Sequence, residues 1–481
     1  MRRAGASAVG VVVVGTALVM AAFGTRPPAA KALSGSGGTT VRASVSASGG
    51  DPDGDSSRAV LSGDGHVVVF HSTATNLVPG DPGPGGFHVY WRDLVHRATR
   101  QVDVSATGGA PGGPGTLPAV SEDGRYVAFQ SDASNLVAGV ADGNHAGDVF
   151  RRDMVTGTTI LVSVSATGGA ADGFSTRPSI SADGRYVAFN STAGNLVANA
   201  PAPGAGTDVY VRDLATGTTV RVASAGGGSP DDVSLRPDIS ADGRYVAFVS
   251  DASNLVPGAP DANGQRDVYR FDRLTGTIRR VSVSTTGGDA SGASTRPAID
   301  DDGRYVVFQS TASNLVAGDS NHQTDVFRRD MVTGTTIRVS VGPTGTQLTG
   351  ASTRGAINAD GRYVAFASND RNVVGGDHNG QRDVFIRDLA TNTNTRASVA
   401  PDSSDGLGCT PTPPPPSVPV PLPTPGTANP FARPGSPDVS TRPSLSADGH
   451  TILFVSGFCN LIPADTNHAD DVFIRTYPPG S

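Results

Sequence analysis

One phrase, Asp-Gly-Arg-Tyr-Val-Ala-Phe, occurs in seven near-identical copies and limits the possible folds more than any other feature of the chain. The copies begin at Asp64, Asp123, Asp183, Asp242, Asp302, Asp360 and Asp448, so that successive starts differ by 59, 60, 59, 60, 58 and 88 residues. A fixed period of this length is typical of supersecondary units that stack in a line or around an axis. The sequence therefore predicts a repeat architecture in place of an ordinary globular core.

The composition indicates that the repeated unit is built from strands and turns. The chain of 481 residues contains 62 glycines and 35 prolines, but a single glutamate, Glu122, and a single lysine, Lys31. Glutamate and lysine favour helices, whereas glycine, proline and aspartate favour turns. We therefore expect an all-β protein.

The unit over residues 175–224 shows the expected plan of each repeat. Four segments have the alternating or β-branched pattern of short strands: residues 175–181, 185–191, 208–213 and 218–224. We call these strands a, b, c and d in chain order. Four antiparallel strands repeated seven times describe a seven-bladed β-propeller.

The two ends of the repeat region complement each other. The seventh unit stops after its strand c, at residues 471–476, whereas residues 39–46 match a strand d such as residues 335–341. We predict that the N-terminal strand completes the last blade and so closes the ring, which removes two free sheet edges.

The first 32 residues are expected to be a signal peptide, with a basic start, an apolar stretch and a small-x-small cleavage site at residues 30–32. A membrane anchor is the alternative, although the stretch is short for a span. The propeller would then cover residues 33–481, with a Pro-rich insertion at about 401–436 between blades six and seven. We expect a protein that is secreted or lies in the cell envelope or periplasm, with no transmembrane segment in the mature chain.

Charge and cysteine content narrow the classes of partner. Removal of residues 1–32 takes away four basic residues and no acidic ones, which changes the formal net charge from −7 to −11. Such an acidic chain is a poor nucleic-acid binder. Cys409 lies in the insertion and Cys459 in a b–c loop of the same face, so an exported protein would form a disulfide between them. We expect a monomer.

The repeats resemble the WD40-like (PD40) β-propeller repeats of the TolB type. The resemblance is carried by residues 177–189 and 207–213 and extends over about residues 39–476. It implies the propeller fold, and proteins similar to it include periplasmic interaction modules and the propeller domains of some peptidases. We expect the chain to lack the amino-terminal domain of TolB and the hydrolase domain of those peptidases, so the resemblance implies no specific partner.

The b–c loops contain a repeated Asp-x-Asn-x-x-x-Asp pattern that could hold a hard cation such as Ca²⁺, because such ions prefer several oxygen ligands from a flexible loop. The alternative is that these side chains cap loop backbone groups as Asx-turns. The candidate metal ligands are Asp142, Asn144, Asp148, Asp261, Asn263, Asp267, Asp319, Asn321, Asp325, Asp377, Asn379, Asp383, Asp465, Asn467 and Asp471.

An arginine lies near the start of strand a in six of the seven units, and Leu117 takes this place in the second unit. Strand a lines the central channel of a propeller, so these arginines should ring the channel mouth, where they could bind an anion. In the alternative interpretation each of them pairs with a loop aspartate, such as the one that begins strand c. The six are Arg58, Arg177, Arg236, Arg296, Arg354 and Arg442.

No catalytic pattern stands out from the repeat. The chain has no His-Glu-x-x-His, Gly-x-Ser-x-Gly or P-loop motif, and its repeated aspartates include no distinguished pair. We therefore expect no catalytic residues, no certain cofactor and a non-enzymatic binding or scaffold module for a protein or glycan partner. Two alternatives are a Ca²⁺-stabilised structural protein of the cell surface and a lyase or hydrolase with its site at the channel mouth.

Overall fold

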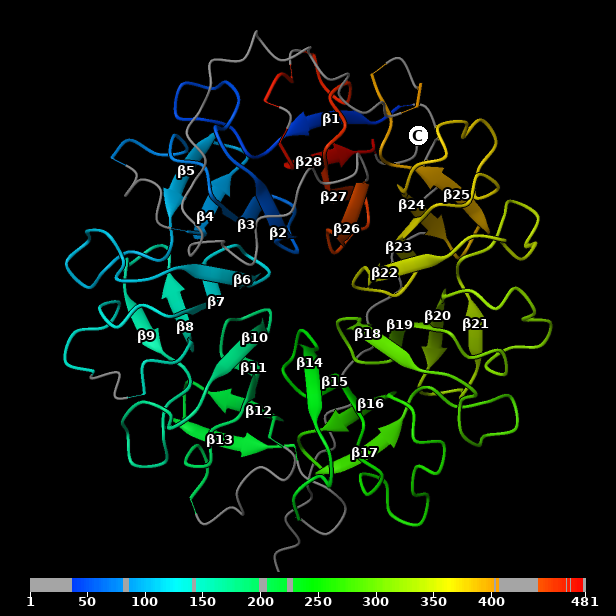
Figure 1. Ribbon diagram of the computed structural model, residues 1–481, viewed down its shortest axis with the longest axis horizontal. Helices are drawn as coiled ribbons and strands as arrows, with labels where there is room; N and C mark the ends of the chain where they lie inside the picture. Colours follow the sequence, from blue (N-terminus) through cyan, green and yellow to red (C-terminus); the bar gives the residue numbers. More distant parts are fainter. Residues whose placement is uncertain are drawn as a thin grey trace, which may run out of the picture.

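The chain folds into seven four-stranded antiparallel sheets arranged around a central axis, as Figure 1 shows. The computed structural model describes residues 37–80, 86–140, 144–198, 206–222, 228–401, 404–405, 440–463, 465–467 and 469–478. These residues form 28 strands and no helix. The predicted seven-bladed β-propeller is confirmed. The predicted signal peptide and nearly all of the predicted insertion lie outside the described residues.

Each blade is a meander whose strands a to d run outward from the axis. The strands of the first three blades are β2 (Ser56–Leu61), β3 (Val67–Ser72), β4 (His88–Asp93), β5 (Ala98–Gln101), β6 (Gly115–Val120), β7 (Tyr126–Ser131), β8 (Asp148–Asp153), β9 (Thr159–Leu161), β10 (Ser175–Ile180), β11 (Tyr186–Ser191), β12 (Asp208–Asp213) and β13 (Thr218–Arg221). Those of the next three are β14 (Ser234–Ile239), β15 (Tyr245–Ser250), β16 (Asp267–Asp272), β17 (Thr277–Arg280), β18 (Ser294–Ile299), β19 (Tyr305–Ser310), β20 (Asp325–Asp330), β21 (Thr336–Arg338), β22 (Ser352–Ile357), β23 (Tyr363–Ser368), β24 (Asp383–Asp388) and β25 (Thr393–Arg396).

The seventh blade is assembled from both ends of the repeat region. It contains β26 (Ser440–Leu445), β27 (Thr451–Ser456), β28 (Asp471–Thr476) and, as its outermost strand, β1 (Thr39–Arg42). β1 pairs antiparallel with β28, with Val41 opposite Ile474, and the two strands lie side by side in Figure 1. The predicted closure of the ring by the N-terminal strand is therefore confirmed.

The repeated phrase builds the core within and between blades. Its phenylalanine lies on strand b and packs on an aromatic residue of strand c, as in Phe189 and Tyr210, whose ring centroids are 5.9 Å apart. Its glycine has a positive φ and contacts the preceding blade: a Cβ on Gly184 would lie 2.2 Å from Cδ2 of Tyr126. The phrase thus fixes both the a–b turn and the spacing of neighbouring blades.

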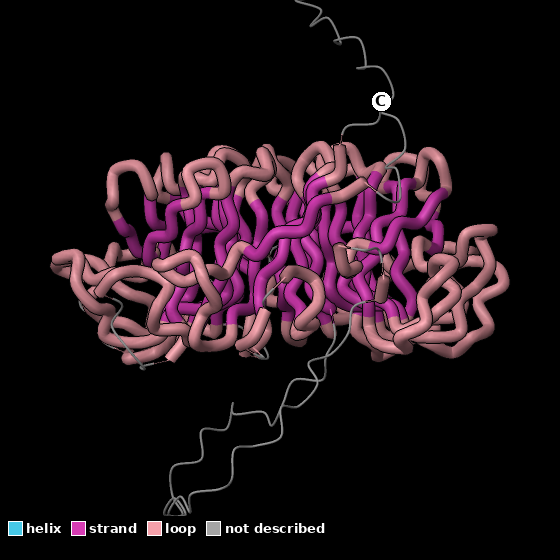
Figure 2. Tube along the Cα trace, turned by 90° about the horizontal axis from the view of Figure 1, so that it is seen from above, coloured by secondary structure: helices cyan, strands magenta, loops and turns pink. Residues whose placement is uncertain are grey.

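The blades form a thick disc with loops on two faces, and the loops on the lower face of Figure 2 spread further outward. The a–b turns are short, whereas the b–c connections span 15 residues between β3 and β4 and 16 between β7 and β8. Because strands alternate in direction, the b–c loops and the d–a connections share one face. Within the described residues, no helix has the length and apolar character needed to cross a membrane.

Candidate functional site

Strand a carries a β-bulge at the same position in every blade. In the third blade, β10 and β11 pair at Thr176 and Asn190 and pair again at Ser179 and Ala188. Two residues of β10 therefore oppose one residue of β11. Such bulges re-aim side chains and are frequent next to binding sites.

The first bulged residue of each blade has a left-handed backbone conformation, although none is a glycine. The φ values are 46° for Arg58, 53° for Leu117, 53° for Arg177, 55° for Arg236, 53° for Arg296, 59° for Arg354 and 57° for Arg442. For an L-residue this conformation costs roughly 1–2 kcal/mol. Seven repeated outliers at one position therefore mark a place where the fold holds side chains in a strained but defined direction.

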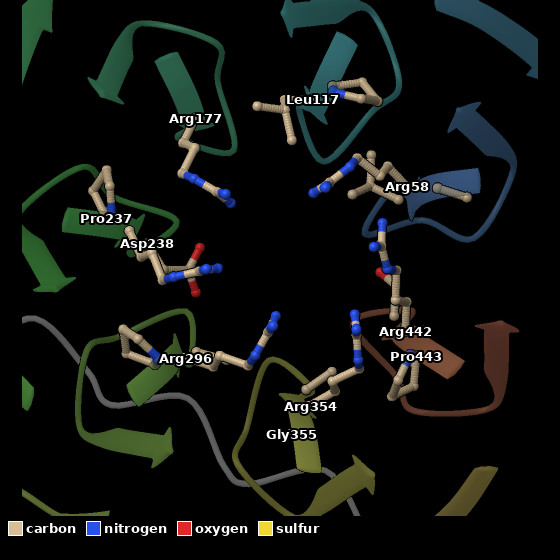
Figure 3. Close-up of a pocket in the computed structure, with 18 of the residues that line it drawn as sticks. Arg58, Leu117, Arg177, Pro237, Asp238, Arg296, Arg354, Gly355, Arg442 and Pro443 are labelled. Atoms are coloured by element: carbon tan, nitrogen blue, oxygen red, sulfur yellow. The ribbon is translucent and has the colours of Figure 1, made fainter. Parts of the chain in front are cut away.

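The bulges direct the six predicted arginines into one pocket at the channel mouth. The pocket has a volume of about 370 Å³ and is lined by residues of all seven strands a, including all six arginines and Leu117. Figure 3 shows Arg58, Arg177, Arg296, Arg354 and Arg442 pointing toward a common central space, with Leu117 in the gap between Arg58 and Arg177. The structure thus brings together residues that lie almost 400 positions apart in the chain.

The ion pairs of the described residues do not support the alternative interpretation, that each channel arginine pairs with a loop aspartate. Among the described residues, none of the six forms an ion pair with a carboxylate. In five blades the aspartate that begins strand c is buried and instead contacts an arginine of strand d; for example, Arg221 Nε lies 3.0 Å from Asp208 Oδ2. The strand-d arginines reach these carboxylates first because they lie across the c–d pairing of the same blade.

The pKa values of the channel arginines are lowered, as expected for buried cations that lie close to one another. Burial, together with repulsion from other channel arginines, lowers the pKa of Arg442 to about 9 and those of Arg236 and Arg354 to about 10. The same causes lower the pKa of Arg58 and Arg177. The pocket is therefore a concentrated positive potential within a chain whose formal net charge is −7.

Amide side chains of the neighbouring blades hold parts of the bulges in place. Asn190 Oδ1 accepts a hydrogen bond from the backbone N–H of Arg236 at 3.1 Å, and Gln309 Oε1 accepts one from that of Arg354 at 3.0 Å. Both amides come from strand b of the blade before. They accept hydrogen bonds from backbone N–H groups that the bulge leaves without a partner in the sheet. They therefore help to hold Arg236 and Arg354 in position.

One carboxyl group lies below the ring. Asp238 lines the same pocket and accepts hydrogen bonds from Ser179 Oγ at 3.0 Å and from the backbone N–H of Ile299 at 2.9 Å. Burial raises the pKa of Asp238. It therefore ties blades three, four and five together and is the acidic member of the pocket lining.

The opposite end of the channel is narrow and acidic. A belt of main-chain hydrogen bonds joins the a–b turns of neighbouring blades, for example from Ala182 N–H to the carbonyl of Ala241 at 2.9 Å and from Ala447 N–H to that of Gly63 at 2.7 Å. Glu122 and Asp301 line this end, and burial together with the charge of Glu122 raises the pKa of Asp301 to about 6. The channel thus has a basic mouth and an acidic floor.

The b–c loops show a different use of arginine. In blade five, Arg338 Nη1 lies 3.2 Å from Asp319 Oδ1 and 3.7 Å from Asp325 Oδ2, while Asn321 Nδ2 donates to Asp325 at 3.0 Å. The guanidinium therefore lies between two candidate metal ligands. Arginines of strand d are placed in the same way in three other blades: Arg280 with Asp261 and Asp267, Arg396 with Asp377 and Asp383, and Arg42 with Asp465 and Asp471.

These contacts support the loop-capping interpretation of the Asp-x-Asn pattern. The described residues contain no group of three or more histidine, cysteine or acidic side chains arranged to hold a metal ion. Asp142 lies outside the described residues, and Asn144 Nδ2 donates to the carbonyl of Ala171 at 2.8 Å. Calcium binding stays a prediction. The disulfide also stays a prediction, because Cys409 lies outside the described residues.

Sequence reasoning found the arginine ring but missed its supports. Asn190, Gln309 and Gln130 occupy one position of strand b, just before its last serine, and Thr176 Oγ1 donates to Gln130 Oε1 at 2.5 Å. These residues could have been found from the sequence, because they are polar at a position of buried strand b where other blades have valine or alanine. Asp238 was also recognisable, because the other units have a small or apolar residue there.

Comparisons with known proteins agree on the fold. No family model and no curated protein matches the chain. Among solved structures it is similar to an oligogalacturonate lyase in complex with manganese (TM-score 0.51, 15% identity, 92% of this chain and 98% of that one). It is also similar to TolB from Acinetobacter baumannii (TM-score 0.35, 17% identity, 66% of this chain and 61% of that one). At 15% identity the likeness to the lyase shows the propeller fold alone.

Proposed function

We propose that this propeller is a non-enzymatic binding module that holds an anionic ligand at the basic mouth of its central channel. The observation that carries the proposal is the convergence of six arginines, with no carboxylate ion-paired to any of them among the described residues, on one pocket of about 370 Å³. Guanidinium groups bind carboxylates and phosphates through paired, charge-assisted hydrogen bonds. Such groups occur on proteins and glycans, the partner classes expected from the sequence.

The chemistry of the pocket supports binding over catalysis. Besides the arginines it is lined by prolines, small or apolar residues, Ser444 and Asp238, and it contains no histidine or cysteine among its described lining residues. The carboxyl of Asp238 already accepts hydrogen bonds from Ser179 and Ile299. No general base next to a nucleophile is formed by these residues. As an exported module, the protein would present this pocket outside the cytoplasm.

Binding of simple anions tests the proposal. We expect pyrophosphate or citrate, titrated at low ionic strength and followed by calorimetry, to bind the wild-type protein and to raise its unfolding temperature. Arg296→Leu should weaken this binding because it removes one guanidinium from the pocket.

Arg304→Leu is the matched control, since Arg304 belongs to the same blade and carries the same charge but pairs with Asp330 outside the pocket. Absence of binding of every anion tested, or equal weakening by both variants, would rule the proposal out.

A further inference from the structure

We infer, on the basis of the proposed function, that the ligand is a compact polyanion with about three or more phosphate or carboxylate groups, which enters the channel end-on and does not thread through it. The number of anionic groups and their path into the channel are properties of the ligand beyond its negative charge.

The arrangement of the guanidiniums indicates how many groups the ligand presents. The arginines belong to six consecutive blades, from the third through the seventh to the first, and Leu117 in the second blade is the single gap. A phosphate group has three strong acceptor oxygens, and a guanidinium in its bidentate mode uses two acceptors. One anionic group therefore satisfies one or two guanidiniums, and a continuous arc of six accommodates about three or more groups.

The size and walls of the pocket favour a compact ligand. Its volume of about 370 Å³ lies near the lower end of the range for small-molecule sites. Prolines follow the bulged residue in five blades and line the pocket as Pro118, Pro178, Pro237, Pro297 and Pro443. Because proline has a fixed φ and a stiff ring, these walls do not easily move apart for a larger ligand.

The floor of the channel stops an anionic chain from passing through. The main-chain belt joins neighbouring blades all round the floor, including a hydrogen bond from Glu122 N–H to the carbonyl of Ala182 at 3.1 Å and one from Asp301 N–H to that of Ala359 at 3.3 Å. The carboxylates of Glu122 and Asp301 line this end as well. A polyanion that advanced from the mouth would meet both a constriction and like charge.

Asp238 marks the inner limit of the anion site. Its carboxyl lies below the arginines in the pocket lining and accepts bonds from Ser179 and Ile299. Both of its oxygens are engaged by protein donors, and the lining beyond the arginines is otherwise of prolines, small or apolar residues and Ser444, so no guanidinium is offered to an anionic group that descends past the ring. The negative groups of the ligand should therefore stay at the level of the guanidiniums.

A series of anions with increasing numbers of charged groups tests the inference. With orthophosphate, pyrophosphate and tripolyphosphate as probes, we expect the affinity to rise about tenfold with each added phosphate, the gain of roughly one further charge-assisted hydrogen bond. The series acetate, succinate and citrate tests carboxylates in the same way, and a rise in either series supports the inference. Long-chain polyphosphate should bind only a few-fold more tightly per molecule than tripolyphosphate, because only its end enters.

A gain-of-charge variant gives an independent test. Leu117→Arg closes the gap in the arc at a position where the backbone conformation already matches the arginine blades, and tripolyphosphate should then bind more tightly by about tenfold. Equal affinity for orthophosphate and tripolyphosphate would overturn the polyanion inference while leaving an anion site in place. Failure of all anions to bind would instead overturn the proposed function itself. Affinity that keeps rising with chain length would overturn end-on entry.

Discussion

Replacing one channel arginine by glycine should make the ligand-free protein more stable and, at the same time, a weaker anion binder. Arg296 is the best position because its charge contributes to the lowered pKa of all five other arginines of the ring, Arg58, Arg177, Arg236, Arg354 and Arg442. It also has a φ of 53°, which glycine adopts without steric cost. Arg296→Gly therefore relieves both repulsion and backbone strain.

The two contributions can be separated by a second variant. The left-handed conformation costs an L-residue roughly 1–2 kcal/mol, and glycine loses about 0.5–1 kcal/mol of this gain through its larger unfolded-state entropy. The net backbone contribution is thus about 0.5–1 kcal/mol in favour of glycine. Arg296→Leu keeps the strain, as Leu117 does in blade two, and removes only the charge.

Urea unfolding at two salt concentrations measures both contributions. At low salt both variants should unfold at a higher urea concentration than the wild type. At 1 M salt the Debye length falls to about 3 Å and weakens the repulsion, so the advantage of the leucine variant over the wild type should shrink, while the glycine variant stays about 0.5–1 kcal/mol more stable than the leucine variant. A leucine variant less stable than the wild type at low salt would refute the reasoning, because the arginines would then be stabilising elements of the fold.

Three further predictions follow from other parts of the ring. Deletion of residues 37–46 should lower the unfolding temperature by exposing the edge of β28, and a synthetic peptide of the deleted sequence should restore it; no effect of the deletion would contradict closure by β1. Burial and the nearby arginines lower the pKa of His71 to about 3. Below the pKa of the unfolded state, a proton therefore binds this histidine preferentially in the unfolded chain, and the protein should lose about 2 kcal/mol of stability between pH 7.5 and pH 5. His71→Gln, which imitates Gln130 in blade two, should remove that part of the acid sensitivity, and an unchanged pH profile would exclude it. His88→Asp alone should be destabilising, because His88 lies 3.0 Å from Asp103 and the variant would place two carboxylates together. Adding Asp103→Ser should restore stability, because it recreates the Asp–Ser hydrogen bond of five other blades. A double-mutant cycle measured by urea unfolding should show strong coupling between the two positions.

The fold could be predicted from the sequence because each level of the repeat indicates the same structure. The phrase at Asp183 fixes the a–b turn, the period fixes the number of blades, and the match between residues 39–46 and a strand d fixes the closure. Strand ends were less predictable. Strand d of blade three ends at Arg221, whereas the pattern extended to residue 224; residues 223 and 224 lie outside the described residues.

The site was predictable in position but not in its chemistry. The period places one arginine per blade next to the axis, so their convergence follows from the fold. Their lack of ion-pair partners among the described residues does not follow, because it depends on which arginine reaches each loop carboxylate, and the strand-d arginines do so by lying opposite strand c. The left-handed bulge was also hidden, since nothing in an Arg-Pro pair announces a positive φ.

The departures of individual blades from the repeat indicate which features of the ring serve the fold. Where His88 replaces the aspartate that begins strand c, Asp103 replaces the serine that bonds to it, and the pair is preserved with its partners exchanged. The arginine ring has no such compensation among the described residues: Leu117 shares the left-handed backbone, whereas the mutual repulsion arises from the arginines alone. An unfavourable contribution of this kind to the stability of the free protein is typical of functional sites, where ligand binding offsets it. A ligand at about 100 times its Kd stabilises the folded protein by about 2.7 kcal/mol, which would offset repulsion among the guanidiniums. Binding of an anion strong enough to neutralise several guanidiniums at once would therefore account for a feature that the fold alone does not require.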